Sequence, residues 1–197
     1  MRVTNRPVGR LGGERLRMLL AFAVTAAVLA VAAFVVDRPA DGPGLTGVSL
    51  TGEASGQAPV VGGFPPDFSA TTVDGEAVSL SSLRGQPVWL TFGASWCGDC
   101  RAEAPDLQAT YARFRDRGLV VLGVFIAEDA EAVSDYARRV GLTFPMVADP
   151  ATQIASRYRT LGIPTHYFIG ADGVIREIRL GGLDPAEMER LVTSLLQ

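Results

Sequence analysis

Both cysteines of the 197-residue chain lie in one motif, Trp96-Cys97-Gly98-Asp99-Cys100. The apolar run before it, Pro87 to Phe92, is typical of a buried strand, and Arg101 to Arg117 carries apolar residues at helical spacing. At the start of a helix, unpaired N–H groups and the positive end of the helix dipole favour a thiolate on Cys97. Cys100 follows one turn later, near enough to displace a mixed disulfide. The motif therefore predicts reversible thiol–disulfide exchange.

Two other uses of the cysteine pair are less well supported. A structural disulfide that closes so small a ring would remove little entropy from the unfolded chain. A zinc site needs about four ligands, and the chain adds only one histidine, His166, to its two cysteines. Redox use is therefore favoured, with Cys97 as the nucleophile and Cys100 as the resolving cysteine. The sequence shows no metal, haem or nucleotide motif, so the disulfide is the only redox group expected.

Two acidic residues near the cysteines are candidates for tuning their chemistry. Asp99, next to Gly98 between the cysteines, would oppose the helix dipole. Because negative charge near a thiolate raises the pKa of the thiol and destabilises the reduced state, Asp99 predicts a reducing couple. The alternative is an ordinary acid in the first turn of a helix. Glu103 lies three residues beyond Cys100, on the same helical stripe, and could accept the proton that Cys100 must lose. The alternative is an ordinary surface glutamate.

Aromatic residues near the motif have two interpretations each. Trp96 either offers a flat apolar contact to a partner or is half-buried packing, whereas Trp89, on the predicted strand, is expected in the core. His166 could approach the cysteines, but strand alternation could equally turn it away, and a structural role is favoured. Pro105 falls inside the predicted helix, where it removes one N–H, and is interpreted as structural.

The N-terminal part of the chain predicts a membrane anchor. Residues 18–36 form an uncharged apolar run of 19 residues, which as a helix would span about 28 Å, close to the thickness of a bilayer core. Residues 1–17 are rich in arginine, which predicts a cytoplasmic N-terminus and an extracytoplasmic location for everything after residue 36. A cleaved signal peptide, with Ala30-Val31-Ala32 at its end, is the alternative, but the run is longer than usual for one.

The rest of the chain divides into a linker and one domain. Residues 37–59 are rich in Gly, Pro, Ser and Thr, which is typical of a flexible linker. Residues 60–197 are long enough to bury a core. They carry more acidic than basic side chains and give no sign of nucleic-acid binding.

Strands and helices alternate in this domain, which predicts an α/β fold with a sheet covered on both faces. A hairpin is expected across Asp74-Gly75, and Val88 to Phe92 is expected to be the central strand. Further strands are predicted over 119–126, 144–147, 165–169 and 174–180, and helices over 97–117, 130–140 and 151–158 and from Asp184-Pro185.

Several separated motifs resemble those of the membrane-anchored TlpA/ResA/CcmG-type thiol–disulfide oxidoreductases, which have a thioredoxin-like fold. They are Pro65-Pro66-Asp67-Phe68, Val73-Asp74-Gly75, Leu80-Ser81-Ser82-Leu83-Arg84-Gly85, the segment Phe92 to Pro105, and Gly162-Ile163-Pro164-Thr165. The resemblance implies a central mixed sheet flanked by helices, with an N-terminal β-hairpin extension.

The resemblance also implies roles and partners. Pro164 corresponds to the family's cis-proline, which lies against the active-site sulfurs, so Ile163 and Pro164 are expected to bind substrate. Trp96, through the flat apolar contact described above, is the third candidate for binding substrate. Glu103 matches a glutamate implicated in proton handling. The implied function is extracytoplasmic reduction of protein disulfides in exported proteins, among them apocytochrome c in cytochrome c biogenesis, with electrons from a membrane thiol donor.

The chain departs from related patterns at three places. Thr91 stands where thioredoxins carry an acid, the dipeptide between the cysteines is Gly98-Asp99 rather than the common Gly-Pro or Glu-Pro, and His166 stands where threonine is frequent. Two rival functions fit the sequence less well. Sco-like copper-handling proteins space their cysteines by three residues and place their histidine in the loop where this chain has Pro164. Thiol peroxidases carry Thr or Ser where this chain has Ala94.

Overall fold

The computed structural model describes residues 17, 23–26, 47–50 and 58–197, and its contacts separate Met1–Pro43 from Gly44–Gln197. Apart from the few positions just named, the predicted tail (1–17), anchor (18–36) and linker (37–59) lie outside the described residues. Within the described part of the chain, no helix is both long enough and apolar enough to span a bilayer. The anchor therefore stays a prediction.

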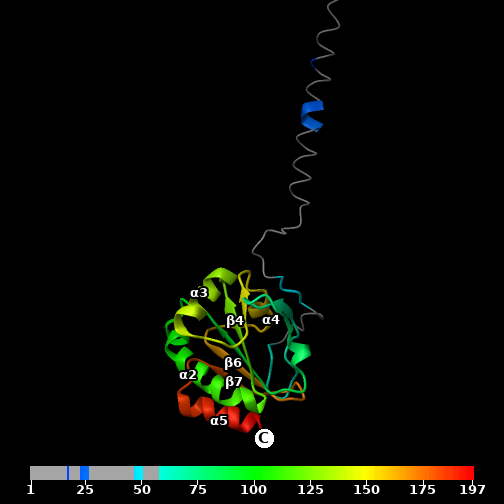
Figure 1. The fold of residues 1–197 in the computed structure, drawn as a ribbon. Coiled ribbons are helices and arrows are strands. Elements are labelled where there is room, and N and C mark those ends of the chain that lie inside the picture. Colours follow the sequence, from blue (N-terminus) through cyan, green and yellow to red (C-terminus); the bar gives the residue numbers. More distant parts are fainter. Residues whose placement is uncertain (1–16, 18–22, 27–46, 51–57) are drawn as a thin grey trace, which may run out of the picture. The chain divides into compact units, whose positions relative to one another are not determined.

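A five-stranded mixed sheet forms the centre of the domain, with strand order β5-β4-β3-β6-β7 (Figure 1). The middle strand is β3 (Val88–Gly93), which runs parallel to β4 (Val120–Ile126) and antiparallel to β6 (Thr165–Ile169). The edges are β5 (Met146–Asp149), parallel to β4, and β7 (Ile175–Leu180), antiparallel to β6. The predicted thioredoxin-like sheet and its central strand are confirmed.

The sheet is covered on both faces, which explains the continuous apolar runs of its strands. Helices α2 (Gly98–Phe114), α3 (Ala130–Val140) and α5 (Pro185–Leu195) pack on one face together with Trp89. The other face packs against a different set of elements. That set comprises α4 (Gln153–Arg157) and the hairpin of β1 (Ser69–Thr71) and β2 (Ala77–Ser79).

Helix α2 begins directly after Cys97, whose side chain accepts a hydrogen bond from the backbone N–H of Cys100. Pro105 lies within the helix and has no N–H, so the carbonyl four residues earlier, at Arg101, has no helical donor. The helix ends at Phe114 and a 3₁₀ turn over Arg115–Arg117 follows. The predicted helix to about Arg117 is thus one α-helix plus a tighter last turn.

Local signals set the boundaries of the other helices. Asp129 caps α3 by accepting from the N–H of Ala132, and Gly141, at a φ of 74°, ends it, as predicted. Asp184 caps α5 by accepting from the N–H of Glu187. Two predicted boundaries were wrong by a few residues. The strand expected at 144–147 is β5, at 146–149, and the helix expected at 151–158 covers only 153–157.

The predicted hairpin forms across Asp74-Gly75, with Gly75 at a φ of 88°. Residues 47–50, which fall within the predicted linker, contact the domain. Ser49 pairs with Ser69 through two backbone hydrogen bonds, and Val48 and Leu50 pack against the core. This short piece of the predicted linker therefore extends the hairpin sheet by one bridge.

Candidate active site

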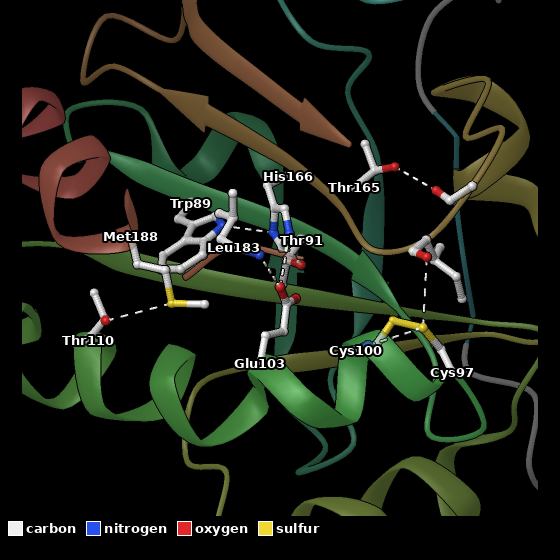
Figure 2. Close-up of polar contacts among 12 residues, drawn as sticks. Trp89, Thr91, Cys97, Cys100, Glu103, Thr110, Thr165, His166, Leu183 and Met188 are labelled. Atoms are coloured by element: carbon white, nitrogen blue, oxygen red, sulfur yellow. Dashed lines mark hydrogen bonds and ion pairs between the residues drawn. A yellow bond between two sulfur atoms is a disulfide. The ribbon is translucent and has the colours of Figure 1, made fainter. Parts of the chain in front are cut away.

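The two cysteines are joined by a disulfide at the N-terminus of α2 (Figure 2). Their Cα atoms are 5.3 Å apart, and both residues are at most 9% exposed. The N–H of Cys100 lies 3.2 Å from the Sγ atom of Cys97. When the pair is reduced, this donor and the helix dipole are placed to stabilise a thiolate on Cys97. The structure thus gives Cys97 the geometry expected of a nucleophile.

The loop before β6 lies against the disulfide. The Ile163–Pro164 peptide bond is cis, and the carbonyl oxygen of Ile163 lies 3.8 Å from the Sγ atom of Cys97. The Ile163 side chain packs against Ala94 and both cysteines. The sequence-predicted residues Ile163 and Pro164 are therefore at the reactive sulfurs, while their binding of substrate stays a prediction.

Three large apolar side chains are exposed on the segments that carry or adjoin the cysteine motif and the Ile163–Pro164 loop. Trp96 is 58% exposed, Leu161 97% and Leu180 69%. Leu180 stands opposite Thr165 in the sheet register, and its side chain lies beside Gly162. We call these three exposed side chains the apolar rim. Neither leucine was predicted from the sequence, although Leu161 directly precedes the Gly-Ile-Pro motif.

Glu103 is buried behind the disulfide, one turn of α2 beyond Cys100. Only 6% of it is exposed, so it is not an ordinary surface glutamate. Its Oε2 atom accepts a hydrogen bond of 3.0 Å from the N–H of Leu183 and lies 3.5 Å from the Nε2 atom of His166. The side chain is thus held on the face of the sheet that α2 covers (Figure 2).

His166 is fully buried on β6, directly opposite Thr91 of β3. Its Nδ1 atom lies 3.3 Å from the indole Nε1 of Trp89 and 3.0 Å from the hydroxyl of Thr91. The structure places the ring against Glu103 and Trp89. Trp89 itself is fully buried, as predicted. We call Trp89, Thr91, Glu103 and His166 the polar cluster.

A small cavity connects the polar cluster with the disulfide. It is lined by Thr91, Cys100, Glu103, Tyr136 and neighbouring apolar residues, and has a volume of about 30 Å³. A water molecule needs roughly 10–15 Å³ of such space, so the cavity is large enough for one between Cys100 and Glu103.

Tyr136 contributes a buried hydroxyl on the α3 side of this region. Burial raises the pKa of Tyr136; the positive charge of Arg101 lowers it in part, and the carboxylates of Glu128 and Glu103 raise it further. The phenol therefore stays protonated and can act as a hydrogen-bond donor. Its hydroxyl has no hydrogen-bond partner among the described residues.

Glu128 holds the loop that leads into the cysteine motif. It is 9% exposed, and one carboxylate oxygen accepts a 2.7 Å hydrogen bond from the N–H of Ser95, while the other contacts the Ser95 hydroxyl. Ser95 lies two residues before Cys97, so the carboxylate fixes the approach to the nucleophile. The sequence analysis missed Glu128 because nothing in the residues after β4 marks one acid as buried.

The remaining predicted residues lie at the surface of the helix start. Gly98 and Asp99 are both exposed, and a tuning role for Asp99 stays a prediction. Among the residues that the structure describes, no group of three or more His, Cys, Asp or Glu side chains is arranged to hold a metal ion. In particular, His166 is not brought together with the two cysteines as a copper site would require.

The AhpC/TSA family profile matches residues 61–178, which is more than half of the chain. The chain belongs to the AhpC/TSA family. Members named thiol-disulfide oxidoreductase ResA are similar to it. The protein of Geobacillus kaustophilus is 33% identical over 138 residues, covering 70% of this chain and 79% of the relative. That of Oceanobacillus iheyensis is 35% identical over 133 residues, covering 66% and 69%.

Solved structures agree with this assignment. A thioredoxin-family thiol:disulfide interchange protein from Chlorobium tepidum has a TM-score of 0.64 and 28% identity, covering 71% of this chain and all of its own. A secreted Mycobacterium tuberculosis disulfide oxidoreductase, described as homologous to DsbE of E. coli, has a TM-score of 0.60 and 28% identity, covering 65% and 96%. This AhpC/TSA-family chain is therefore a thiol–disulfide oxidoreductase with a thioredoxin-like fold.

The residues before Cys97 do not fit the thiol peroxidase alternative. A peroxidase would need a hydroxyl side chain three residues before its reactive cysteine. Ala94 occupies that place and is completely buried. The nearest side-chain hydroxyl in the sequence before Cys97 is that of Ser95, and it contacts Glu128. The site is built for exchange between two cysteines rather than for activating a peroxide.

Proposed function

We propose that this AhpC/TSA-family protein is a membrane-anchored, extracytoplasmic reductase of protein disulfides. One observation carries the proposal: the Cys97–Cys100 disulfide caps α2 on one side and adjoins the buried carboxylate of Glu103 on the other. The ResA name of the relatives and the secreted DsbE-like structure support the compartment and the chemistry. The arginine-rich N-terminus before the apolar run supports the anchor.

The reaction follows from the positions of the two sulfurs. The Cys97 thiolate attacks one sulfur of the substrate disulfide, forming a mixed disulfide and releasing one substrate thiolate, which takes up a proton. Cys100 then gives its proton to the Glu103 carboxylate, directly or through a water molecule in the cavity. The Cys100 thiolate attacks the Cys97 sulfur, the second substrate thiolate leaves, and the Cys97–Cys100 disulfide forms. A membrane thiol donor returns two electrons to the pair.

The substrate class follows from the apolar rim. Apocytochrome c is the proposed substrate among exported proteins with a cysteine pair, and apolar residues beside such a pair would contact Trp96 and Leu161. The loop at Ile163 and Pro164 lies beside Cys97, where an extended substrate segment would pass. Cytochrome c maturation is the proposed process.

The proposal is tested first by the equilibrium reduction potential of residues 60–197 in glutathione and dithiothreitol buffers. We expect a value well below about −200 mV, in the range of reductants. A value above about −180 mV, close to that of protein disulfide isomerase, would instead identify an oxidase or isomerase.

Location and substrate need separate measurements. Alkaline phosphatase, which needs an oxidising compartment to become active, is fused after residue 59 of the full chain, and activity is expected. An inactive fusion would overturn the extracytoplasmic location. A peptide with an apocytochrome-like Cys-x-x-Cys-His disulfide should be reduced faster than the same peptide with its apolar flanking residues replaced by serine. Equal rates would overturn recognition by the apolar rim.

A further inference from the structure

His166 is a buried polar side chain that the proposed reaction does not use. It is completely buried, and every ring atom that can form a hydrogen bond faces the polar cluster. A buried imidazole is expected to be hydrogen-bonded, because an unpaired polar group in the interior destabilises the fold. Its two nitrogen atoms have different surroundings, and this difference determines which nitrogen donates a hydrogen bond and which accepts one.

The indole of Trp89 determines which ring nitrogen carries the proton. An indole N–H can donate a hydrogen bond but cannot accept one. Because Trp89 donates to Nδ1 of His166 at 3.3 Å, Nδ1 must present its single lone pair, and the hydroxyl of Thr91 lies 3.0 Å from the same atom. This contact favours the tautomer that carries the ring proton on Nε2.

The protonated Nε2 atom faces the carboxylate of Glu103. Its distance to Oε2 is 3.5 Å, and Nε2 has no hydrogen-bond partner among the described residues. Catalytic hydrogen bonds are frequently long in the resting state and shorten during reaction. Arg179 stands opposite His166 on β7, but its guanidinium binds Glu177 and Glu187, so it does not compete for Glu103.

We infer that His166 is a positioning residue for Glu103, holding its carboxylate where it takes the proton of Cys100. The N–H of Leu183 donates to Oε2, and the Nε2 atom of His166 lies 3.5 Å from the same oxygen, where a small movement would make it the second donor. His166 does not store the proton itself, because its other nitrogen is occupied by Trp89 and Thr91. This inference rests on the proposed role of Glu103 in the resolving step.

The experiment separates the two chemical steps. The reduced protein is mixed with Ellman's reagent, an aromatic disulfide, in a stopped-flow instrument. Attack by Cys97 releases the first coloured thiolate and leaves a mixed disulfide. Attack by Cys100 on Cys97 releases the second and forms the protein disulfide. Only the second phase requires Cys100 to lose its proton beside Glu103.

His166→Leu should slow the second phase about tenfold, the usual effect of losing one hydrogen bond to a charged group, and leave the first phase within about twofold. His166→Gln, which keeps an N–H donor, should restore most of the rate. In a Glu103→Gln background, His166→Leu should add nothing, because the two residues act through one contact. Equal slowing of both phases, or an additive effect in the double variant, would overturn the inference.

Failure of the inference and failure of the Glu103 role give different results. If Glu103→Gln leaves the second phase unchanged, Glu103 is not the proton acceptor. If Glu103→Gln slows it and His166→Leu does not, only the role of His166 is wrong.

A spectroscopic measurement keeps the test independent of whether the leucine variant folds. The chain has a single histidine, so the ring nitrogens of His166 give one set of NMR signals. We expect the proton on Nε2 in the wild-type protein and a shifted Nε2–H signal in Glu103→Gln. Glu131→Gln, an exposed acid on α3, should leave the signal in place. A proton on Nδ1, or no response to Glu103→Gln, would contradict the inference.

Discussion

Two groups of side chains near the disulfide differ in character. The apolar rim of Trp96, Leu161 and Leu180 is exposed to solvent. The polar cluster is buried and hydrogen-bonded across three elements. The usual distribution of polar and apolar side chains is reversed at this site. The comparison indicates that the exposed group binds the partner and the buried group moves the proton.

The largest loss of activity is expected when a cysteine of the disulfide is replaced. Cys100→Ser removes the resolving sulfur but leaves Cys97, its carbonyl contact and the apolar rim in place. Turnover should be lost, while Cys97 still reacts and stays covalently attached to the substrate. Non-reducing electrophoresis and mass spectrometry would show the trapped complex. Cys97→Ser is the matched control and should trap nothing; trapping by that variant would mean that Cys100 attacks first.

The next largest loss of activity is expected when Glu103, in the polar cluster, is replaced. Glu103→Gln should lower steady-state turnover about hundredfold, the lower end of the range for a general base, with little change in KM. Insulin reduction assayed by turbidity would measure it. Glu131→Gln should have wild-type activity. A changed KM with unchanged kcat would show that Glu103 acts in substrate binding rather than in proton transfer. The difference in role between the apolar rim and the polar cluster would then be wrong.

The two tryptophans sharpen the comparison, because one lies in each region. Trp89→Ala empties a fully buried site and should reduce the free energy of unfolding by about 3–5 kcal/mol. Trp96→Ala should change it by no more than about 0.5 kcal/mol. It should instead raise KM for a protein substrate about tenfold, as loss of an exposed aromatic contact does at interfaces. Urea unfolding and substrate titration would measure the two effects. A destabilised Trp96→Ala variant would show that Trp96 is packing.

The smallest effect is expected at the leucines of the apolar rim. Leu161→Ser should raise KM for a protein substrate about threefold, since part of one apolar side chain loses its contact. Reduction of Ellman's reagent, which is too small to reach Leu161, should not change. Val140→Ser, at an exposed apolar position near the end of α3, is the control. Equal changes for both substrates would exclude a role for Leu161 in recognising proteins.

Much of the fold could be predicted because its signals are local. Asp129 and Gly141 mark the ends of α3 within one turn each, and Asp74-Gly75 marks the hairpin. The redox pair was also predictable, because a cysteine at the N-cap of a helix after a buried strand has its chemistry determined by neighbouring backbone.

The inner half of the site was harder to predict, for a definite physical reason. Every residue of β6 is buried, so the strand shows no polar and apolar alternation that could place His166 on one face. Helical spacing put Glu103 near Cys100 but could not show that Leu183, 80 residues later, would cover it. Both depend on contacts between distant segments.

Pro105 has a consequence for motion. Because it leaves the carbonyl of Arg101 without a helical donor, the first turn of α2 is joined to the rest by one backbone hydrogen bond fewer than any other turn of the helix interior. That turn carries Cys100 and is capped by Cys97, while Thr110 and Arg113, after Pro105, contact Met188 and Glu189 of α5. In hydrogen–deuterium exchange, the amides of the reactive turn would open without unfolding the rest of the helix. Reduction and oxidation can then adjust the sulfur positions while the packed body of α2 stays fixed.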